Sequence, residues 1–454
     1  MPGDLVLSCV GQADDTVLLA NDIWKLYHLL QLCLEYCQKH CVQLSPTKTK
    51  LVMVTADKAP SWIPYNPVRV NGSSIELSDQ AEHVGVLRSV KGNMPNILQR
   101  ISAFKGALGA IMSCGLARGR RTNPVVSLKI LALYGTPVLM SGLSSLVLSR
   151  KEVSCIDQQY KRTLQNILKL STTSPSCLVS FIAGKLPGTA ILHLRQLSLF
   201  GMICRLEGDP LHRLAVQVLL TSVCKYSWFV QIRELLLLYQ LPHPLHLLHS
   251  PPSKDQFKKL TKAHVLSYWE TKLRAEADLL PSLVYFHPKF MSLTAPHRLW
   301  TTAGKNTYEV AKARVQLLFL SSQYPCAKHV RHWSKENPLG LCSYGPCQES
   351  LEVESPEHIL LHCPSYSEIR FQSSMNCFNV TDPISHSLVS TILGSSTNQT
   401  IMQFLLDCSV IPDVIRAAQC FGDHIYNDLF YLSRTWCYVI HRERLKRLCK
   451  WNFQ

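Results

Sequence analysis

Two adjacent carboxylates, Asp14 and Asp15, lie between two short apolar segments near the start of the chain, at residues 5–7 and 17–19. Apolar runs on both sides of a polar pair predict a tight β-hairpin with the acids at its tip. Paired carboxylates on rigid strands can hold Mg²⁺, and two such ions can stabilise the attacking and leaving oxygens of phosphoryl transfer. An Asp-Asp pair taken alone is more often a solvated turn, so the following residues must decide between the two interpretations.

The residues after the hairpin predict a helix and then another strand. Asn21 or Asp22 can cap the helix, because a short polar side chain at this position accepts hydrogen bonds from the first backbone amides. The apolar positions of this helix recur at near-helical spacing and are Ile23, Leu26, Leu30, Cys33, Cys37 and Cys41. A turn at Pro46 then leads, through Lys-Thr-Lys at residues 48–50, into an apolar strand at residues 51–54.

This order of elements resembles the palm of reverse transcriptases of the LINE type, which belong to non-LTR retrotransposons. In that family an Ala-Asp-Asp sequence is followed by a helix and a Lys-Thr-Lys strand, as it is here. The resemblance implies that Asp14 and Asp15 are catalytic ligands of Mg²⁺ and that Lys48 or Lys50 lies near the incoming nucleoside triphosphate. The implied reaction is RNA-directed DNA synthesis by two-metal phosphoryl transfer.

The resemblance continues after the Lys-Thr-Lys strand. Residues 68–77 predict two short strands about an Asn-Gly turn of type I′. Residues 82–86 resemble the family's short hydrophobic-glycine element near the primer grip. Residues 137–142 and 157–170 resemble the thumb that follows the palm.

Two features depart from the family pattern. Gln12 stands where the family usually has an aromatic residue before Ala-Asp-Asp. The family also carries a third catalytic carboxylate on an earlier strand, and only 13 residues precede Asp14 in this sequence. Because two Asp residues without that ligand bind metal poorly, we expect half an active site and no autonomous polymerisation. An upstream polymerase half supplied in trans would complete the site.

A second group of candidate ligands lies near the other end of the chain. Cys342 and Cys347 are followed by His358 and Cys363, and three thiolates with one imidazole suit a closed tetrahedral Zn²⁺ site. A Gly-Pro turn before Cys347 would bring the first pair together, and the second pair can converge if the end of its helix loosens. His362 competes with His358 as the imidazole ligand. The alternative is a helix with a core histidine and unpaired cysteines.

This segment resembles the zinc-knuckle-like module downstream of many LINE-type reverse transcriptases, in which a cysteine pair precedes Glu-His-Ile-Leu-Leu-x-Cys-Pro. Four residues separate the first two cysteines here, whereas the family commonly has two. Because no open coordination position or general base is evident, a zinc ion here would be structural.

The charge of the chain favours a nucleic-acid partner. Lys and Arg total 47 against 31 Asp and Glu, which gives a net charge of +16. Such an excess attracts phosphate backbones, so we expect RNA and RNA–DNA hybrids as partners, although a basic protein with no such partner is the alternative. Basic runs at residues 118–121 and 441–450 fit nuclear localisation, and the second also fits the solvated face of a terminal helix.

The cysteine usage and the hydropathy favour an intracellular protein, nuclear or cytoplasmic, with no membrane partner. The 18 cysteines follow no regular framework, and the first residues lack a basic signal-like region. Residues 130–149 carry no charge, but Gly135, Pro137 and Gly142 favour a buried thumb helix and a turn over a membrane span.

These patterns predict an α+β protein in which a partial palm precedes a mainly helical region. The predicted segments are a partial palm at residues 1–90, a thumb-like region at 91–240, a helical connection at 255–335, and the zinc-knuckle-like module with C-terminal helices at 336–454. A proline-rich linker is expected between residues 241 and 254. The expected function is that of a nucleic-acid-binding C-terminal remnant of a reverse transcriptase; the alternative is a non-catalytic nucleic-acid-binding or scaffold protein derived from the element.

Overall fold

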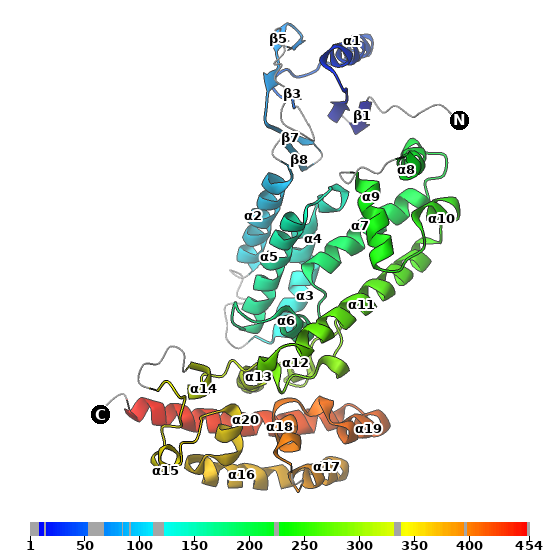
Figure 1. Cartoon of the computed structure of the whole chain (residues 1–454). Helices are drawn as coiled ribbons and strands as arrows, with labels where there is room; N and C mark the ends of the chain where they lie inside the picture. Colours follow the sequence, from blue (N-terminus) through cyan, green and yellow to red (C-terminus); the bar gives the residue numbers. More distant parts are fainter. Residues whose placement is uncertain are drawn as a thin grey trace. The chain divides into compact units, whose positions relative to one another are not determined.

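The computed structural model describes residues 9–12, 15–52, 68–83, 85–89, 92–111, 122–221, 227–330, 337–394 and 397–451 (Figure 1). Over these residues the protein is mainly helical, and its few strands are at most four residues long. The predicted succession of small strands and then helices is confirmed in this coarse form. A reverse-transcriptase palm remains a prediction.

The predicted hairpin forms around the Asp-Asp sequence. Strands β1 (Cys9–Gln12) and β2 (Asp15–Leu18) pair antiparallel, with Gln12 opposite Asp15. Asp15 is the first residue of β2 and is exposed to solvent. Asp14, like the basic run at residues 118–121, lies outside the described residues.

A helix and two further strand pairs follow the hairpin. Helix α1 (Ile23–Lys39) begins after Asp22, whose carboxylate accepts a hydrogen bond from the Lys25 amide at 2.8 Å. Asp22 is therefore the helix cap, as predicted. The short strands that follow are β3 (Lys50–Leu51), β4 (Arg69–Val70), β5 (Ser73–Ser74), β6 (Glu76–Leu77), β7 (Gln80–His83) and β8 (Val86–Ser89). β3 pairs with β6 in parallel, whereas β4 pairs with β5 and β7 with β8 antiparallel.

The turn between β4 and β5 is the predicted Asn-Gly turn. Asn71 has a φ of 48° and Gly72 a φ of 81°, and a type I′ turn requires positive φ at both central positions. The elements around it share one small core, in which Leu30 of α1, Val70 of β4 and Val68 just before β4 are buried. Partly buried residues packed against this core are Leu18, Ile23, Tyr27, Leu34, Leu44, Leu51 and Ile75. The hairpin, the helix and the strands therefore form one packed substructure.

The rest of the described chain is helical. The next elements are α2 (Met94–Ile111), α3 (Pro124–Ile130), η2 (Leu131–Gly135), α4 (Thr136–Met140), η3 (Leu143–Ser145), α5 (Arg150–Leu168), α6 (Ser176–Ala183), α7 (Gly188–Cys204), α8 (Pro210–Thr221), α9 (Trp228–Leu238), α10 (Pro244–His249) and α11 (Lys254–Asp278). They are followed by η4 (Pro281–Leu283), η5 (Pro288–Phe290), α12 (Arg298–Thr301), α13 (Thr307–Leu320), α14 (Ala327–Val330), α15 (Gly345–Glu349), η7 (His358–His362), η8 (Pro364–Tyr366), α16 (Ser367–Phe378), α17 (Pro383–Leu393), α18 (Asn398–Asp407), η9 (Cys408–Val410), α19 (Pro412–Phe421) and α20 (His424–Trp451).

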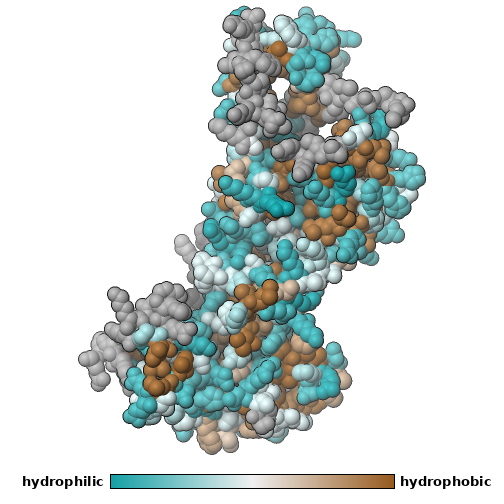
Figure 2. Space-filling model, in the orientation of Figure 1, coloured by the Kyte–Doolittle hydropathy of each residue, from teal (hydrophilic) through white to brown (hydrophobic). Residues whose placement is uncertain are grey.

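The chain divides into two compact units, each made of three segments. The first consists of Met1–Gly106, Thr136–Asp157 and Thr189–Val265, and the second of Ala107–Gly135, Gln158–Gly188 and Leu266–Gln454. Hydrophilic residues cover much of the visible surface, and apolar patches interrupt them (Figure 2). No single helix in the described part of the chain is long and apolar enough to cross a membrane.

The segment predicted as a linker contains a helix. Residues 244–249 form α10, which starts at Pro244, and the His243 side chain accepts a hydrogen bond from the Leu245 amide. The prediction was wrong here because proline at the first turn of a helix fits the backbone and lacks only an amide that would have no helical partner.

In the first unit, α7 and α11 approach closely at Gly201. A Cβ atom at this position would lie 2.3 Å from Cδ1 of Phe257, and the Phe257 ring is buried. Real carbon contacts do not become so short, so this packing requires a glycine on α7. Glycine normally weakens a helix interior, which indicates that the close approach of the two helices compensates for that cost.

The second unit packs around α20, the long helix drawn in red in Figure 1, which contacts α13, α16, α18 and α19. Several aromatic residues of α20 belong to this core: Phe430 is fully buried and Trp436 is 5 % exposed. Arg434 pairs with the buried Glu309 of α13, and Glu309 also contacts Lys312 at 2.8 Å. Arg434 therefore supports the fold and is not available to nucleic acid.

A second buried polar contact joins the start of α12 to the end of α18. His297 Nδ1 accepts a hydrogen bond from the Leu299 amide at 3.2 Å, so Nε2 carries the hydrogen that it donates to Asp407 at 3.1 Å. Ser409 donates to the other oxygen of Asp407 at 2.6 Å. Burial alone would raise the pKa of Asp407, but His297 and the Ser409 hydrogen bonds outweigh burial and hold this pKa below its usual value.

We expect Gly201→Ala to lower the free energy of unfolding by about 1–3 kcal/mol, because the added carbon displaces the buried Phe257 ring. Urea unfolding followed by circular dichroism measures this change. Gly106→Ala is the matched control, because Gly106 lies in α2 and a Cβ there meets nothing within 4 Å. The control should stabilise the protein by about 0.5–1 kcal/mol. Equal effects of the two substitutions would contradict the packing argument.

We expect Asp407→Asn to lower the free energy of unfolding by about 1–3 kcal/mol near neutral pH, because the buried carboxylate accepts bonds from two side chains. Its folded-state pKa is depressed, so its contribution is present above the unfolded value near 3.8 and is lost as pH falls further. Urea unfolding from pH 3 to pH 7 should show the two proteins converging at the acidic end.

Asp423→Asn is the control for this comparison. Asp423 makes an exposed ion pair with Arg298, so the same substitution should cost at most about 1 kcal/mol. A difference between the parent chain and Asp407→Asn that stays constant down to pH 3 would show that the carboxylate charge contributes nothing to stability.

Candidate metal centre

The first two candidate ligands are held by a short backbone loop in the second unit. Leu341 and Val353 form an antiparallel bridge, and between them the Cys342 amide donates to the Glu352 carbonyl at 2.8 Å. The Glu352 amide in turn donates to the Cys347 carbonyl at 2.9 Å. The Gly-Pro sequence predicted as a simple turn begins the one-turn helix α15, which carries Cys347. These bonds place the two cysteines side by side despite the four residues between them.

The other two candidate ligands are joined by a widened helical turn. Residues 358–362 form the π-helix η7, and the Cys363 amide donates to the His358 carbonyl at 2.6 Å. In an α-helix with 100° per residue, positions five apart lie about 140° from each other around the axis. The wider i→i+5 turn removes most of this offset, so the predicted loosening of the helix is confirmed.

The four residues converge. Their ligand atoms, the sulfurs of Cys342, Cys347 and Cys363 and one nitrogen of His358, all lie within 4.8 Å of one another, and all four residues are buried. The sulfurs of Cys342 and Cys363 are 3.8 Å apart. In a tetrahedral site with Zn–S bonds of about 2.3 Å, two sulfurs also lie about 3.8 Å apart. This cluster can therefore hold a metal ion such as zinc, and it is the only such group among the residues that the structure describes.

The electrostatics of the cluster fit a cation. Within the described chain, His358 Nε2 is buried and has no hydrogen-bond partner, so a metal bond would satisfy it. The other ring nitrogen lies 3.9 Å from a Glu352 carboxylate oxygen, and a carboxylate in that position orients a metal-bound imidazole.

The thiols of the cluster also influence each other's protonation. The contact with Cys363, together with burial, raises the pKa of Cys342 to about 12. The same contact lowers the pKa of Cys363, while burial raises that of Cys347. The sulfurs of Cys342 and Cys363 are close enough for one thiol to donate a hydrogen bond to the other, and a metal ion would displace that proton.

The alternative imidazole, His362, lies outside the cluster. Its Nε2 pairs with the Asn398 amide at 3.0 Å and lies 3.6 Å from a Glu357 oxygen, and its side chain is 47 % exposed. His358 is therefore the imidazole ligand of the four-residue group. The sequence left both histidines open as the ligand. His358 is buried within the cluster, whereas the exposed His362 side chain contacts Asn398 and Glu357.

No pattern in the sequence pointed to the residues that support the cluster. Glu354 is buried and accepts a hydrogen bond from the Ala327 amide at 2.7 Å, while both of its oxygens contact Arg444 of α20 at 2.9 and 3.2 Å. Arg370 of α16 donates to the Cys363 carbonyl at 2.7 Å. The segments that carry the candidate ligands are thus bonded to two helices of the second unit. Arg444, which belongs to the basic run at residues 441–450, is buried in this contact.

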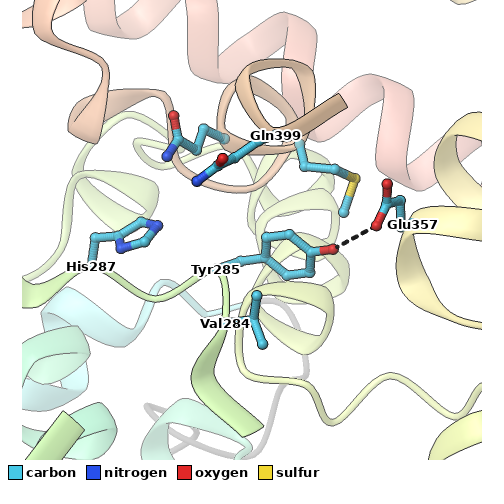
Figure 3. A pocket seen from close by; sticks show the side chains of 7 residues that line it. Val284, Tyr285, His287, Glu357 and Gln399 are labelled. Atoms are coloured by element: carbon cyan, nitrogen blue, oxygen red, sulfur yellow. Dashed lines mark hydrogen bonds between the residues drawn. The ribbon is translucent and has the colours of Figure 1, made fainter. Parts of the chain in front are cut away.

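A small pocket of the second unit is lined in part by Glu357 (Figure 3). Its volume is about 190 Å³, and Tyr285 donates a hydrogen bond to Glu357 across it at 3.3 Å. Burial raises the pKa of Tyr285 to about 12. The remaining lining residues are Val284, His287, Gln399, Met402 and Gln403. No pattern in the sequence brought these residues together.

The residues predicted to act on nucleotides lie on the surface of the N-terminal substructure. Lys48 belongs to the turn after α1, Lys50 pairs with Glu76 across β3 and β6, and both lysines are exposed. Asp15 is exposed at the start of β2. Because Asp14 lies outside the described residues, the predicted Mg²⁺ site remains a prediction.

We expect the chain to bind one equivalent of Co²⁺ or Zn²⁺ tightly, and expect Cys347→Ala and His358→Ala to abolish this stoichiometric binding. Visible absorption of the Co²⁺ form, displaced by Zn²⁺, measures it. Glu352→Gln should weaken affinity by about tenfold, because the carboxylate contacts the imidazole and not the ion. Chelation should lower the melting temperature.

Cys377→Ala is the matched control, because Cys377 is equally buried but lies outside the cluster. It should retain one equivalent of metal. Loss of metal in this control, or full retention in His358→Ala, would show that the four-residue group is not the binding site.

Searches with this chain found no matching family model, no matching curated protein and no matching solved structure.

Proposed function

We propose that this chain is a nucleic-acid-binding, C-terminal part of a reverse transcriptase of the non-LTR retrotransposon type, with a structural zinc ion in its Cys/His cluster. Its partners would be RNA and RNA–DNA hybrid. The proposal starts from two sequence motifs at opposite ends of the chain that resemble the same family: the Asp-Asp hairpin and the Cys-Cys-His-Cys series.

The observation that carries the proposal is the convergence of the second motif. The four residues span 21 positions from Cys342 to Cys363, yet their ligand atoms lie within 4.8 Å of one another. The three cysteines of this group, and His358 as one of two possible imidazole ligands, are predicted from the sequence alone. A chance likeness in sequence would give no reason for three sulfurs and one imidazole to converge in a buried cluster.

Zinc fits this donor set better than other common ions. Thiolate and imidazole ligands select soft or borderline metals, and four buried protein ligands leave no open position for substrate. The ion would therefore hold the loop around Cys342 against the turn around Cys363. Its chemistry would be stabilisation of the fold and not catalysis.

The N-terminal substructure gives weaker support to the proposal. Its hairpin, capped helix and Lys-Thr-Lys strand share one small core, in the order that the palm resemblance requires. In this proposal Asp14 and Asp15 would hold Mg²⁺ for phosphoryl transfer, and Lys48 or Lys50 would contact the triphosphate.

Binding to nucleic acid would depend mainly on charge. The chain carries a net charge of +16, and contacts to backbone phosphates release counterions that weaken binding as salt rises. Such contacts carry little base information, so affinity should depend little on sequence.

We expect the chain to bind fluorescein-labelled RNA and RNA–DNA hybrid, with an affinity that falls at least about tenfold between 50 and 200 mM salt. Fluorescence anisotropy measures this dependence. A peptide nucleic acid of the same base sequence is the control: it lacks phosphates and should not bind. Affinity for RNA that stays the same over this range of salt would contradict the proposal.

A further inference from the structure

Helix α11 carries a row of exposed lysines on one side. Lys254, Lys258 and Lys262 recur at every fourth position, and Lys259 lies next to them. All four side chains are exposed, and all four belong to the first compact unit. We call Lys254, Lys258 and Lys262 the lysine row.

The row has almost no compensating charge. Asp255 is the only acid between residues 254 and 262 against four lysines. Among the described residues, no ion pair involves any of these four lysines. A solvated helix face usually alternates the signs of its charges and forms pairs between them, whereas this face concentrates one sign.

The side of α11 next to the lysine row is fixed in the fold. Phe257, Thr261 and Val265 are buried, and Phe257 fits against the glycine of α7 described above. The start of the helix is held by a reciprocal cap, in which the Ser253 amide donates to Gln256 and the Gln256 amide donates to Ser253. The lysine row is therefore presented by a rigid element and not by a loop.

The spacing of the row suits a line of phosphates. Four residues of α-helix advance about 6 Å, so the row extends over about 12 Å. A nucleic-acid duplex carries about one negative charge per 1.7 Å of its axis, so this length of helix can contact several phosphates at once. Lysine contacts each phosphate as a flexible point charge and requires no particular base.

We propose that the lysine row of α11 binds the phosphate backbone of the nucleic acid, independently of its sequence. This inference rests on the proposed function and specifies the surface that serves it. The partner is a nucleic-acid strand and not an acidic protein, because a regular row of unpaired like charges matches the regular charge of a phosphate backbone.

The test compares the full chain with its Lys254→Gln, Lys258→Gln, Lys262→Gln triple variant on a labelled RNA–DNA hybrid at several salt concentrations. Each lost phosphate contact reduces the slope of log affinity against log salt by about 0.7 to 0.9. The triple variant should therefore lower the magnitude of this slope by about two, and weaken binding at 50 mM salt by roughly tenfold or more.

Two controls distinguish an effect of the lysine row from an effect of the total charge of the chain. The triple Lys→Arg variant at the same positions should keep the slope of the parent chain. A triple Lys→Gln variant at Lys39, Lys129 and Lys305, which are exposed on three separate segments, removes the same charge and should change the slope by less than one.

The outcomes distinguish this inference from the proposed function. If the parent chain does not bind the hybrid, the proposed function fails. If the parent binds with a steep salt dependence but the row variant matches the scattered variant, the proposed function stands and the lysine row is not the binding surface. Circular dichroism spectra that superimpose for all variants would show that binding, and not folding, has changed.

Discussion

The ion pair between Glu354 and Arg444 connects the candidate metal centre to the longest helix of the protein. Both side chains are about 8 % exposed, and their contacts at 2.9 and 3.2 Å use both carboxylate oxygens. Two charges withdrawn from water are tolerated only when they satisfy each other, and here the Ala327 amide adds a further bond. The loop that carries Cys342 is therefore positioned by α20, which itself packs on five other α-helices of the described chain.

Other buried acids of the second unit are also paired with basic or polar side chains. Glu309 is neutralised by Arg434 and Lys312, and Asp407 is held by His297 and Ser409. The contacts of Glu309 with Arg434 and of Asp407 with His297 join residues more than 100 positions apart, so each selects a particular arrangement of helices. The apolar residues of α20 make the packing favourable, and the paired charges determine its register. Arg434 and Arg444 of the basic terminal helix are therefore committed to the fold.

The sequence predicted those structural features that depend on only a few neighbouring residues. The Asp-Asp hairpin, the Asp22 cap and the Asn-Gly turn each depend on a few adjacent residues, whose backbone preferences are readable from the sequence. The linker containing α10 shows the limit, because proline can either end a helix or begin one. The buried polar partners Glu354 and Asp407 could not be predicted, since nothing in a linear pattern reveals which distant charge will meet them.

For the candidate metal centre, too, some features could be predicted from the sequence and others could not. Residue type and spacing were sufficient to name the three cysteines, but two histidines remained possible until burial separated His358 from His362. What placed His358 against Cys363 is the π-turn, and this turn has a consequence for how the segment can change in evolution. Losing a single residue between His358 and Cys363 would shorten the turn to the ordinary helical interval, and gaining one would rotate the cysteine away. An ordinary helical turn would still leave the imidazole and the sulfur on one face, whereas a longer turn would separate them, so this segment can be shortened by one residue more readily than it can be lengthened.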